Sequence, residues 1–341
     1  MNFSSDNAAG VSPRIMAALA AANQGHAMAY GEDSVTKAAE AAFTELFERE
    51  LAVFPVATGT AANALALSAL TPPWGQIYCH RNAHIEEDEA GAPELFTGGA
   101  KLALLDGEHG KITAETLANA VAAAPFGVQH HSQPSALSLT QASEAGTVYQ
   151  PGEVAALAAI AHNSGLSVHM DGARFANALA HLACSPAEAT WKAGIDVLSF
   201  GATKNGAMAA EAVIFFDPEA ADDFLYRRKR GGHLFSKMRY LSAQLVAYLR
   251  DDLWLEDARH ANACATTLSQ GLAALDGAHL VHPVEANEIF VHLPETVLKA
   301  LEVGGVGFHR WGSGGQARFV CAFDTDPDDV DRALQIAQNA A

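Results

Sequence analysis

The sequence is poor in cysteine and contains no long apolar segment. Its four cysteines are far apart and form no CxxC pair, which indicates neither a disulfide framework nor a zinc site and is typical of a reducing compartment. No run of about 18 apolar residues occurs, and the N-terminus becomes polar within a few residues. We therefore expect a soluble cytoplasmic protein without a signal peptide or a membrane span.

Basic residues are also scarce. The chain of 341 residues has 21 Lys and Arg against 39 Asp and Glu, a formal net charge of −18. Such a surface repels nucleic acid and anionic membranes, so we expect neither as a partner. Half of the residues are hydrophobic, which allows a large buried core, and the length is typical of about two domains.

One lysine lies on a turn made of small residues. The stretch Val197–Gly206 begins as a short apolar strand and continues as Gly-Ala-Thr-Lys-Asn-Gly, which presents Lys204 beyond the strand end. A lysine with such small neighbours can form a Schiff base with an aldehyde cofactor. Most lysines on turns are simply solvated, so this interpretation depends on a second, matching group.

A carboxylate provides that match. Residues 167–175 read as another strand that ends in Asp171, with Arg174 soon after it. A pyridoxal enzyme needs a lysine for the aldehyde carbon and a carboxylate for the pyridine nitrogen. The lysine and the acid together therefore indicate a pyridoxal site.

A possible anion site lies between a strand at 51–56 and a helical run at 61–70. The connecting Thr58, Gly59 and Thr60 would place free backbone N–H groups and two hydroxyls around an anion at a helix start. Ordinary N-capping by Thr58 or Thr60 explains the same residues. Neither nucleotide-binding fingerprint, GxGxxG or GxxxxGK[ST], occurs here.

Strands that alternate with helices across residues 51–216 predict an α/β fold with a mostly parallel sheet covered on both faces. Ligands of such sheets gather beyond the carboxyl ends of the strands, and Asp171, Lys204 and Thr58–Thr60 all follow strand ends. We expect a large cofactor-binding domain at residues 1–245 that includes the N-terminal segment, and a small α+β domain at residues 246–341.

Histidines and one arginine complete the candidate residues. His80 and His84, near Asp88 and other acids, suit a metal site, but no third ligand has matching spacing. We prefer the alternative that the His84 ring stacks on a planar cofactor. We therefore predict no metal. His130 and His131 precede a strand and read by default as solvated or core residues. Arg318 lies within an apolar strand, where it needs a partner such as a carboxylate.

Together these motifs resemble the L-threonine aldolase family. The resemblance runs from Phe3 to Phe323 and rests on seven segments: residues 4–6, 30–33, 58–60, 84 with 89–91, 171–174, 199–206 and 317–320. It implies a pyridoxal-phosphate enzyme of fold type I that splits L-threonine, L-allo-threonine and other β-hydroxy-α-amino acids into glycine and an aldehyde.

The resemblance also implies roles for single residues. Lys204 would carry the cofactor, and the other cofactor contacts would come from Thr58, Gly59, Thr60, His84, Asp171 and Arg174, the last on the phenolic side of the ring. Ser5 and Arg318 would hold the substrate carboxylate. Tyr30 would come from near the site of the other subunit, which implies a homodimer or a homotetramer.

The chain departs from the commoner family pattern at one place that matters for catalysis. Many members read Glu-Asn-Thr-His where this chain has Ser138-Leu-Thr-Gln141. His130 or His131, helped by Asp88, would then replace the missing histidine, which is typical of a subgroup that tolerates many aldehydes, including that of phenylserine. His84 or His130 is our candidate for the base at the β-hydroxyl, since an imidazole suits that task near neutral pH.

Other functions remain open at this point. A β-eliminating lyase, an aminotransferase or a racemase would use the same lysine and acid. A metal-dependent hydrolase built on His80 and His84 is a further alternative. So is a pyridoxal-binding or acidic interaction module without turnover.

Overall fold

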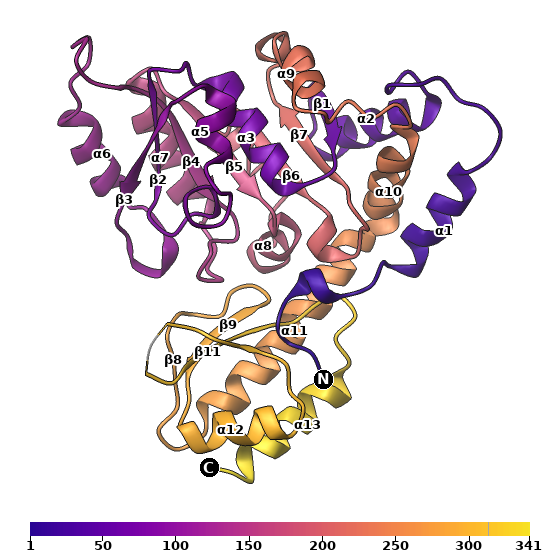
Figure 1. Ribbon diagram of the computed structural model, residues 1–341, viewed down its shortest axis with the longest axis vertical. Helices are drawn as coiled ribbons and strands as arrows, with labels where there is room; N and C mark the ends of the chain where they lie inside the picture. The colour runs from indigo at the N-terminus through magenta and orange to yellow at the C-terminus, as the bar shows by residue number, and fades with distance from the viewer. Residues whose placement is uncertain (313) are drawn as a thin grey trace.

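The larger part of the molecule is built on a seven-stranded sheet (Figure 1). The computed structural model describes residues 1–312 and 314–341. The strands follow the order β1-β7-β6-β5-β4-β2-β3, with bounds β1 Ala52–Val56, β2 Gly75–His80, β3 Lys101–Leu105, β4 Gln133–Thr140, β5 Ser167–Gly172, β6 Val197–Gly201 and β7 Glu211–Phe215. Neighbouring strands from β3 to β6 pair in parallel, whereas β7 is antiparallel to both β6 and β1. The predicted α/β fold with a mostly parallel sheet is confirmed.

Helices cover both faces of this sheet. Those of the larger part are α1 Pro13–Ala22, α2 Ser34–Leu46, α3 Gly59–Leu70, α4 His84–Glu87, α5 Ala92–Thr97, α6 Ala114–Ala122, α7 Pro151–Asn163, α8 Phe175–Leu182, α9 Phe224–Arg230 and α10 Arg239–Leu249. Alternate side chains of one strand point to opposite faces. Leu198 thus joins the core formed with α2, α7, α8 and α10, and Val197 joins the core formed with α3 and α9.

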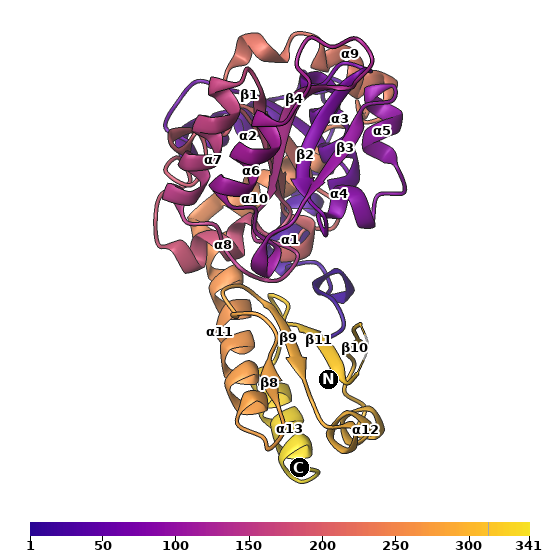
Figure 2. The same ribbon diagram turned by 90° about the vertical axis from the view of Figure 1, so that its left-hand side faces the viewer.

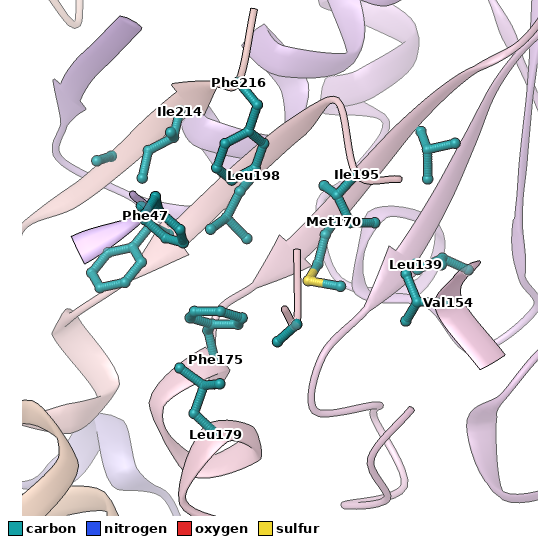
Figure 3. Close-up of a cluster of buried hydrophobic side chains, with 14 of the residues drawn as sticks. Phe47, Leu139, Val154, Met170, Phe175, Leu179, Ile195, Leu198, Ile214 and Phe216 are labelled. Carbon is teal, nitrogen blue, oxygen red and sulfur yellow. The ribbon is translucent and has the colours of Figure 1, made fainter. Parts of the chain in front are cut away.

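The largest apolar cluster lies on the first of these faces. Figure 3 shows Phe47, Phe175 and Phe216 beside Leu198 at its centre, with Met170 and Leu139 on the neighbouring strands. The rings of Phe47 and Phe216 meet edge to face, with centroids 5.2 Å apart. This packing fixes β5 and β6, the two strands that carry Asp171 and Lys204 at their ends.

A smaller unit follows the sheet domain (Figure 2). Its four strands are antiparallel in the order β10-β11-β9-β8, with bounds β8 His279–Leu280, β9 Glu288–His292, β10 His309–Arg310 and β11 Gln316–Val320. Three helices pack with them, namely α11 Leu253–Ala273, α12 Glu295–Val303 and α13 Pro327–Gln338. This unit has the predicted α+β composition.

Helix α11 belongs to both parts of the molecule. Leu253, Trp254 and Ala258 pack in the core of the sheet domain, whereas Cys264 and Leu268 pack in the core of the smaller unit. The core therefore changes within α11, later than the boundary that we predicted at residue 246. A continuous helix gives no sequence signal where its packing partner changes, so the sequence could not place this boundary.

The N-terminal segment also departs from the predicted division. We expected residues 1–245 to form the large domain, but Phe3 is buried in the core of the smaller unit and its ring meets Phe319 edge to face, with centroids 6.5 Å apart. Backbone hydrogen bonds join Phe3 to Gly307 and Val320. The first residues thus attach to the smaller unit before the chain enters the sheet domain.

None of the helices within residues 1–312 and 314–341 combines the length and the apolar character that a bilayer crossing requires.

Candidate active site

Two adjoining cavities meet at Lys204. The first, of about 400 Å³, lies at the carboxyl ends of β5 and β6 beside the start of α3, and we call it the sheet-edge cavity; its walls include Thr58, Gly59, Thr60, Asn63, Asp171 and Glu211. The second, of about 520 Å³, lies between the sheet domain and the smaller unit, and we call it the inter-lobe cavity; its walls include Ser5, Asp88, Glu144, Arg174, Glu288 and Arg318. Asn7, His84 and Lys204 line both cavities.

Lys204 lies on a single turn of 3-10 helix, Thr203–Asn205, between β6 and β7. Two hydrogen bonds hold this turn in place. The Asn205 amide donates to the Tyr248 hydroxyl and to the Trp254 carbonyl, each at 2.8 Å. Lys204 itself forms no hydrogen bond or ion pair with any residue that the structure describes. A rigid turn thus carries a lysine whose amine remains available to a ligand.

Asp171 is the second-last residue of β5 and is buried. Its Oδ1 accepts a hydrogen bond from the Ala173 N–H at 3.0 Å, and its Oδ2 accepts one from the Asn63 amide at 2.8 Å. These donors fix the plane of the carboxylate at the wall of the sheet-edge cavity. An ionised carboxylate held in this way is the group that keeps a pyridine nitrogen protonated.

A chain of hydrogen bonds connects Asp171 to His84. The Asn63 amide nitrogen also donates to Oε1 of Glu89 at 2.8 Å, and that oxygen lies 2.9 Å from Nδ1 of His84. The hydrogen bond with Glu89 raises the pKa of His84 above its ordinary value, while burial raises the pKa of the Glu89 carboxyl. Since Nδ1 of His84 is engaged, its Nε2 is the nitrogen left for a ligand.

The segment Thr58–Thr60 both caps helix α3 and provides free donors. The Thr58 hydroxyl accepts a hydrogen bond from the Ala61 N–H at 3.2 Å, so the capping interpretation is confirmed. The N–H groups of Gly59 and Thr60 have no acceptor among the described residues. A Cβ placed on Gly59 would meet no atom within 4 Å, which leaves open space in front of the helix start.

These groups fit pyridoxal phosphate. The helix start supplies N–H donors for a phosphate, Asp171 supplies a carboxylate for the ring nitrogen, and Lys204 supplies an amine for the aldehyde. All three face one cavity. The donor set therefore matches each polar end of the cofactor.

Arg318 lies on β11 in the wall of the inter-lobe cavity. Its Nη2 lies 3.3 Å from Oε1 of Glu288, and its Nε is buried without a partner among the described residues. Its guanidinium carbon lies 5.4 Å from the centre of the Trp311 ring. Donor atoms of Arg318 thus remain free for an incoming carboxylate. Ser5 lines the same cavity, and its hydroxyl accepts a hydrogen bond from the Asn7 N–H at 3.1 Å.

Arg174 is held by acids on two sides. Its Nε and Nη2 donate to the carboxylate of Asp6 at 2.7 and 3.0 Å, and its Nη1 lies 3.0 Å from Oε2 of Glu288. Arg174 lines the inter-lobe cavity next to Lys204. The predicted contact with the phenolic side of a cofactor ring stays a prediction.

His130 and His131 lie far from both cavities. They are exposed in the turn that precedes β4, whereas the site lies beyond the opposite end of that strand. The 8 residues of β4 span roughly 26 Å at ~3.3 Å each. Within one chain, His130 and His131 therefore cannot replace the missing histidine, because the residues before a parallel strand emerge at its amino end.

Of the remaining predicted residues, Asp88 and His80 line the inter-lobe cavity, whereas Tyr30 lines neither cavity. Asp88 follows α4 in the wall of the inter-lobe cavity, close to His84 along the chain. Both ring nitrogens of His80 are engaged, Nε2 with the Gly107 carbonyl at 3.0 Å and Nδ1 with the Asn82 N–H at 3.2 Å. Tyr30 lines neither cavity; its side chain is 49% exposed, and Lys229 Nζ lies 5.0 Å from its ring centre.

Sequence reasoning missed three polar residues of the site. Asn63 is the only polar residue of the helical stretch Ala61–Leu67 and is buried, which is a signal that it needs a partner. Glu211 opens the apolar strand β7; burial raises its pKa to about 7, and it accepts a hydrogen bond from the Ala202 N–H. Glu144 follows β4 and gave no comparable signal.

Comparisons with known proteins agree with this geometry. The sequence model of one family, described as beta-eliminating lyase, matches residues 2–296. The chain is 47% identical to the low specificity L-threonine aldolase of Pseudomonas aeruginosa, covering 99% of this chain and 96% of that protein, and 47% identical to the enzyme of the same name from Pseudomonas sp. strain NCIMB 10558, covering 95% and 93%. Among solved structures, Leishmania major threonine aldolase superposes with a TM-score of 0.93 at 26% identity, covering 99% of this chain and 98% of that one.

Proposed function

Since the chain belongs to the beta-eliminating lyase family, and to the L-threonine aldolases within it, we propose that it is a lyase that cleaves L-threonine, L-allo-threonine and related β-hydroxy-α-amino acids into glycine and an aldehyde. The observation that carries this proposal is the position of Lys204 at the junction of two cavities. One cavity suits a phosphorylated pyridine aldehyde and the other suits an amino acid.

The residues of the sheet-edge cavity would hold the cofactor. Pyridoxal phosphate, when bound, supplies the electron sink for the pair that the broken Cα–Cβ bond leaves on Cα. Gly59 and Thr60 would bind its phosphate, Asp171 would keep its ring nitrogen protonated, and Lys204 would bind its aldehyde carbon. His84 would stack on the ring, with its own plane fixed by Glu89.

The residues of the inter-lobe cavity would orient the substrate. Arg318 would hold the α-carboxylate, assisted by the Ser5 hydroxyl, because a guanidinium binds a carboxylate through two parallel hydrogen bonds. With the amine near Lys204 and the carboxylate at Arg318, rotation about Cα is restricted. The Cα–Cβ bond is then held in one orientation, which is how positioning lowers the barrier to cleavage.

Proton transfer at the β-hydroxyl requires a base within this cavity. His84 and Asp88 line it, whereas His130 does not. The unengaged Nε2 of His84 is suited to accept a proton near neutral pH. We therefore keep His84 among the candidates for this role, with Asp88 beside it.

A second copy of the chain is a further part of the proposal. Tyr30 lies outside both cavities of its own chain and is half exposed. Its ring and Lys229 therefore form a surface available to the site of a partner subunit. This supports a homodimer or a homotetramer.

An absorbance spectrum of the purified protein with pyridoxal phosphate, followed by borohydride reduction and peptide mapping, tests the cofactor and its anchor together. We expect a visible band that reduction fixes on the peptide containing Lys204. Assays with threonine, allo-threonine and phenylserine then test cleavage, and a keto-acid acceptor tests transamination. A protein that stays colourless, or that transaminates without releasing glycine, would overturn the proposal.

A further inference from the structure

A carboxylate of the inter-lobe cavity has no role in the chemistry described so far. Glu144 lies in the turn Ser143–Gly146 that follows β4, and it lines this cavity together with His84, Lys204 and Arg318. Its carboxylate has no hydrogen bond or ion pair with the residues that the structure describes. An acid that faces a ligand cavity without a protein partner is available to the ligand.

The turn that carries Glu144 is rigid. The Ser143 N–H donates to the Thr147 carbonyl at 2.8 Å, and the Gly146 N–H donates to the Ser143 carbonyl at 2.9 Å. The Ser143 and Thr147 hydroxyls lie 2.7 Å apart, and both donate to the carbonyl of His109. Both side chains are fully buried, so this end of the turn has one defined position in the sheet domain.

The smaller unit holds the same turn from its other side. The Glu285 N–H donates to the Gly146 carbonyl at 3.3 Å, and the Glu285 carboxylate accepts from the Val148 N–H at 2.7 Å. A Cβ on Gly146 would lie only 2.9 Å from the Glu288 carbonyl. Glu288 lies on β9, which pairs with β11, so the turn is placed against the neighbour of the strand that carries Arg318.

Glu144 is therefore fixed relative to both groups that would orient the substrate. If Lys204 marks the position of the amine and Arg318 that of the carboxylate, the β-hydroxyl lies in the cavity that Glu144 also faces. Of the other three carboxylates in this wall, Glu288 pairs with Arg174 and Arg318, and Glu87 and Asp88 are exposed at the C-terminal end of α4.

We propose that Glu144 is a catalytic acid–base residue that takes up the proton of the substrate β-hydroxyl; this proposal rests on the proposed aldolase function. The electron pair of the O–H bond becomes the C=O π bond of the aldehyde as the Cα–Cβ bond breaks, and the pair of that bond stays on Cα. Glu144 then releases this proton to solvent, and Cα takes up a proton from water, which yields glycine. No further reactant is needed.

The surroundings of Glu144 make its carboxylate a stronger base than an exposed one. Burial raises the pKa of its carboxyl; the charge of Lys204 opposes this effect, and that of Glu288 adds to it. The titratable or charged groups around it are His84, His109, Asp171, Arg174, Lys204 and Glu288. A base whose pKa lies close to the working pH transfers protons most efficiently.

The test compares cleavage with a partial reaction in the holoenzyme. Glu144→Gln should lower kcat for threonine and phenylserine by about 10²–10⁴-fold, the range for loss of a general base. Exchange of the α-hydrogen of glycine in D₂O, followed by NMR, should remain within about threefold, since glycine has no β-hydroxyl. Glycine affinity, measured by calorimetry, should not change. The acidic limb of the pH profile of kcat/KM, where Glu144 becomes protonated, should also disappear.

Two controls make each outcome decisive. Glu108→Gln removes an exposed carboxylate from the neighbouring turn and should leave both reactions unchanged. Glu144→Ala should regain cleavage when formate is added, because a small carboxylate can enter the vacated space. Full cleavage by Glu144→Gln, or equal loss of cleavage and glycine exchange, would overturn the role of Glu144 alone. A wild-type protein that neither cleaves threonine nor exchanges glycine would overturn the aldolase function and this inference with it.

Discussion

Nδ1 of His84 lies 2.9 Å from Oε1 of Glu89, and the Glu89 side chain is fully enclosed by protein. The buried carboxylate determines which ring nitrogen carries the proton and which one faces the cavities. Because Asn63 joins Glu89 to Asp171, the residue expected above the cofactor ring and the residue expected at its nitrogen belong to one hydrogen-bond network.

Replacing Glu89 with Gln should lower the pKa of His84, because the hydrogen bond with this carboxylate is the main cause of the raised value. NMR titration of the His84 ring in cofactor-free protein measures the change. Glu86→Gln, in the same short helix, is the matched control, since Glu86 makes no hydrogen bond to His84. An unchanged His84 titration in Glu89→Gln would show that the network does not control the imidazole.

A methyl group at Gly59 should weaken cofactor binding without harming the fold. The Cβ of Gly59→Ala enters open space at the start of α3, so stability should stay equal or rise by up to ~1 kcal/mol. The affinity for pyridoxal phosphate should fall at least tenfold. Gly152→Ala, at the start of α7 and equally free of contacts, should have the same effect on stability and leave the affinity for pyridoxal phosphate unchanged. Fluorescence titration and thermal melting of the cofactor-free variants distinguish the two effects.

Arg318→Lys should raise KM for threonine while cofactor binding stays intact. A lysine keeps the charge but loses the paired donors that match a carboxylate, and a hydrogen bond to a charged group contributes ~1.5–3 kcal/mol. We therefore expect kcat/KM to fall by roughly 10- to 100-fold. Arg310→Lys, on the neighbouring strand β10 and paired with Glu295 and Glu302, should keep normal kinetics. Equal effects of the two variants would refute the carboxylate role of Arg318.

Asp6→Asn should destabilise the protein, most strongly at neutral pH. Burial alone would raise the pKa of Asp6, but its ion pair and hydrogen bonds with Arg174 give a net lowered value. A lowered carboxyl pKa stabilises the fold above the ordinary value of 3.8, and this contribution is lost as the pH falls through the folded-state value. Breaking a buried pair costs ~3–5 kcal/mol. Chemical unfolding across pH 2–7 measures the free energy of unfolding, with exposed Asp331→Asn as control. A difference in this free energy between wild type and Asp6→Asn that does not change with pH would contradict the prediction.

His130→Ala should leave kcat/KM unchanged within about twofold, since His130 is exposed at the opposite edge of the sheet and lines neither cavity. Surface substitutions away from a site have small effects. His84→Ala, in contrast, should reduce kcat/KM strongly, because His84 lines both cavities. Parallel steady-state assays on the two variants decide this, and strong loss in His130→Ala would contradict the position found for this residue.

The fold could be predicted from the sequence because its signals are local. Apolar strands such as Val197–Gly201 alternate with alanine-rich helices, and helical crossover connections of this kind favour parallel pairing. The change of core within α11 could not be predicted, since it depends on which side chains meet in three dimensions. The attachment of Phe3 to the smaller unit is a contact between distant parts of the chain, and it has no local signature either.

The same difference between local signals and long-range contacts applies to the residues of the candidate site. Lys204, Asp171 and Gly59 lie at or just after strand ends, so the rule for parallel sheets placed them together correctly. His130 was misplaced because the pattern located a histidine near a strand without deciding which end of that strand faces the ligand. Glu144 escaped notice because its position depends on a turn that is held by residues from two different units.

The continuous helix α11 has a consequence for how the molecule comes apart. The first turns of α11 belong to one core and its later turns to the other. When either unit unfolds, α11 loses apolar contacts, and the other unit needs α11 for its own core. The chain therefore cannot be divided at residue 246 into two fragments that each keep a closed core. Both units use α11 as part of their core, so we expect them to fold and unfold together.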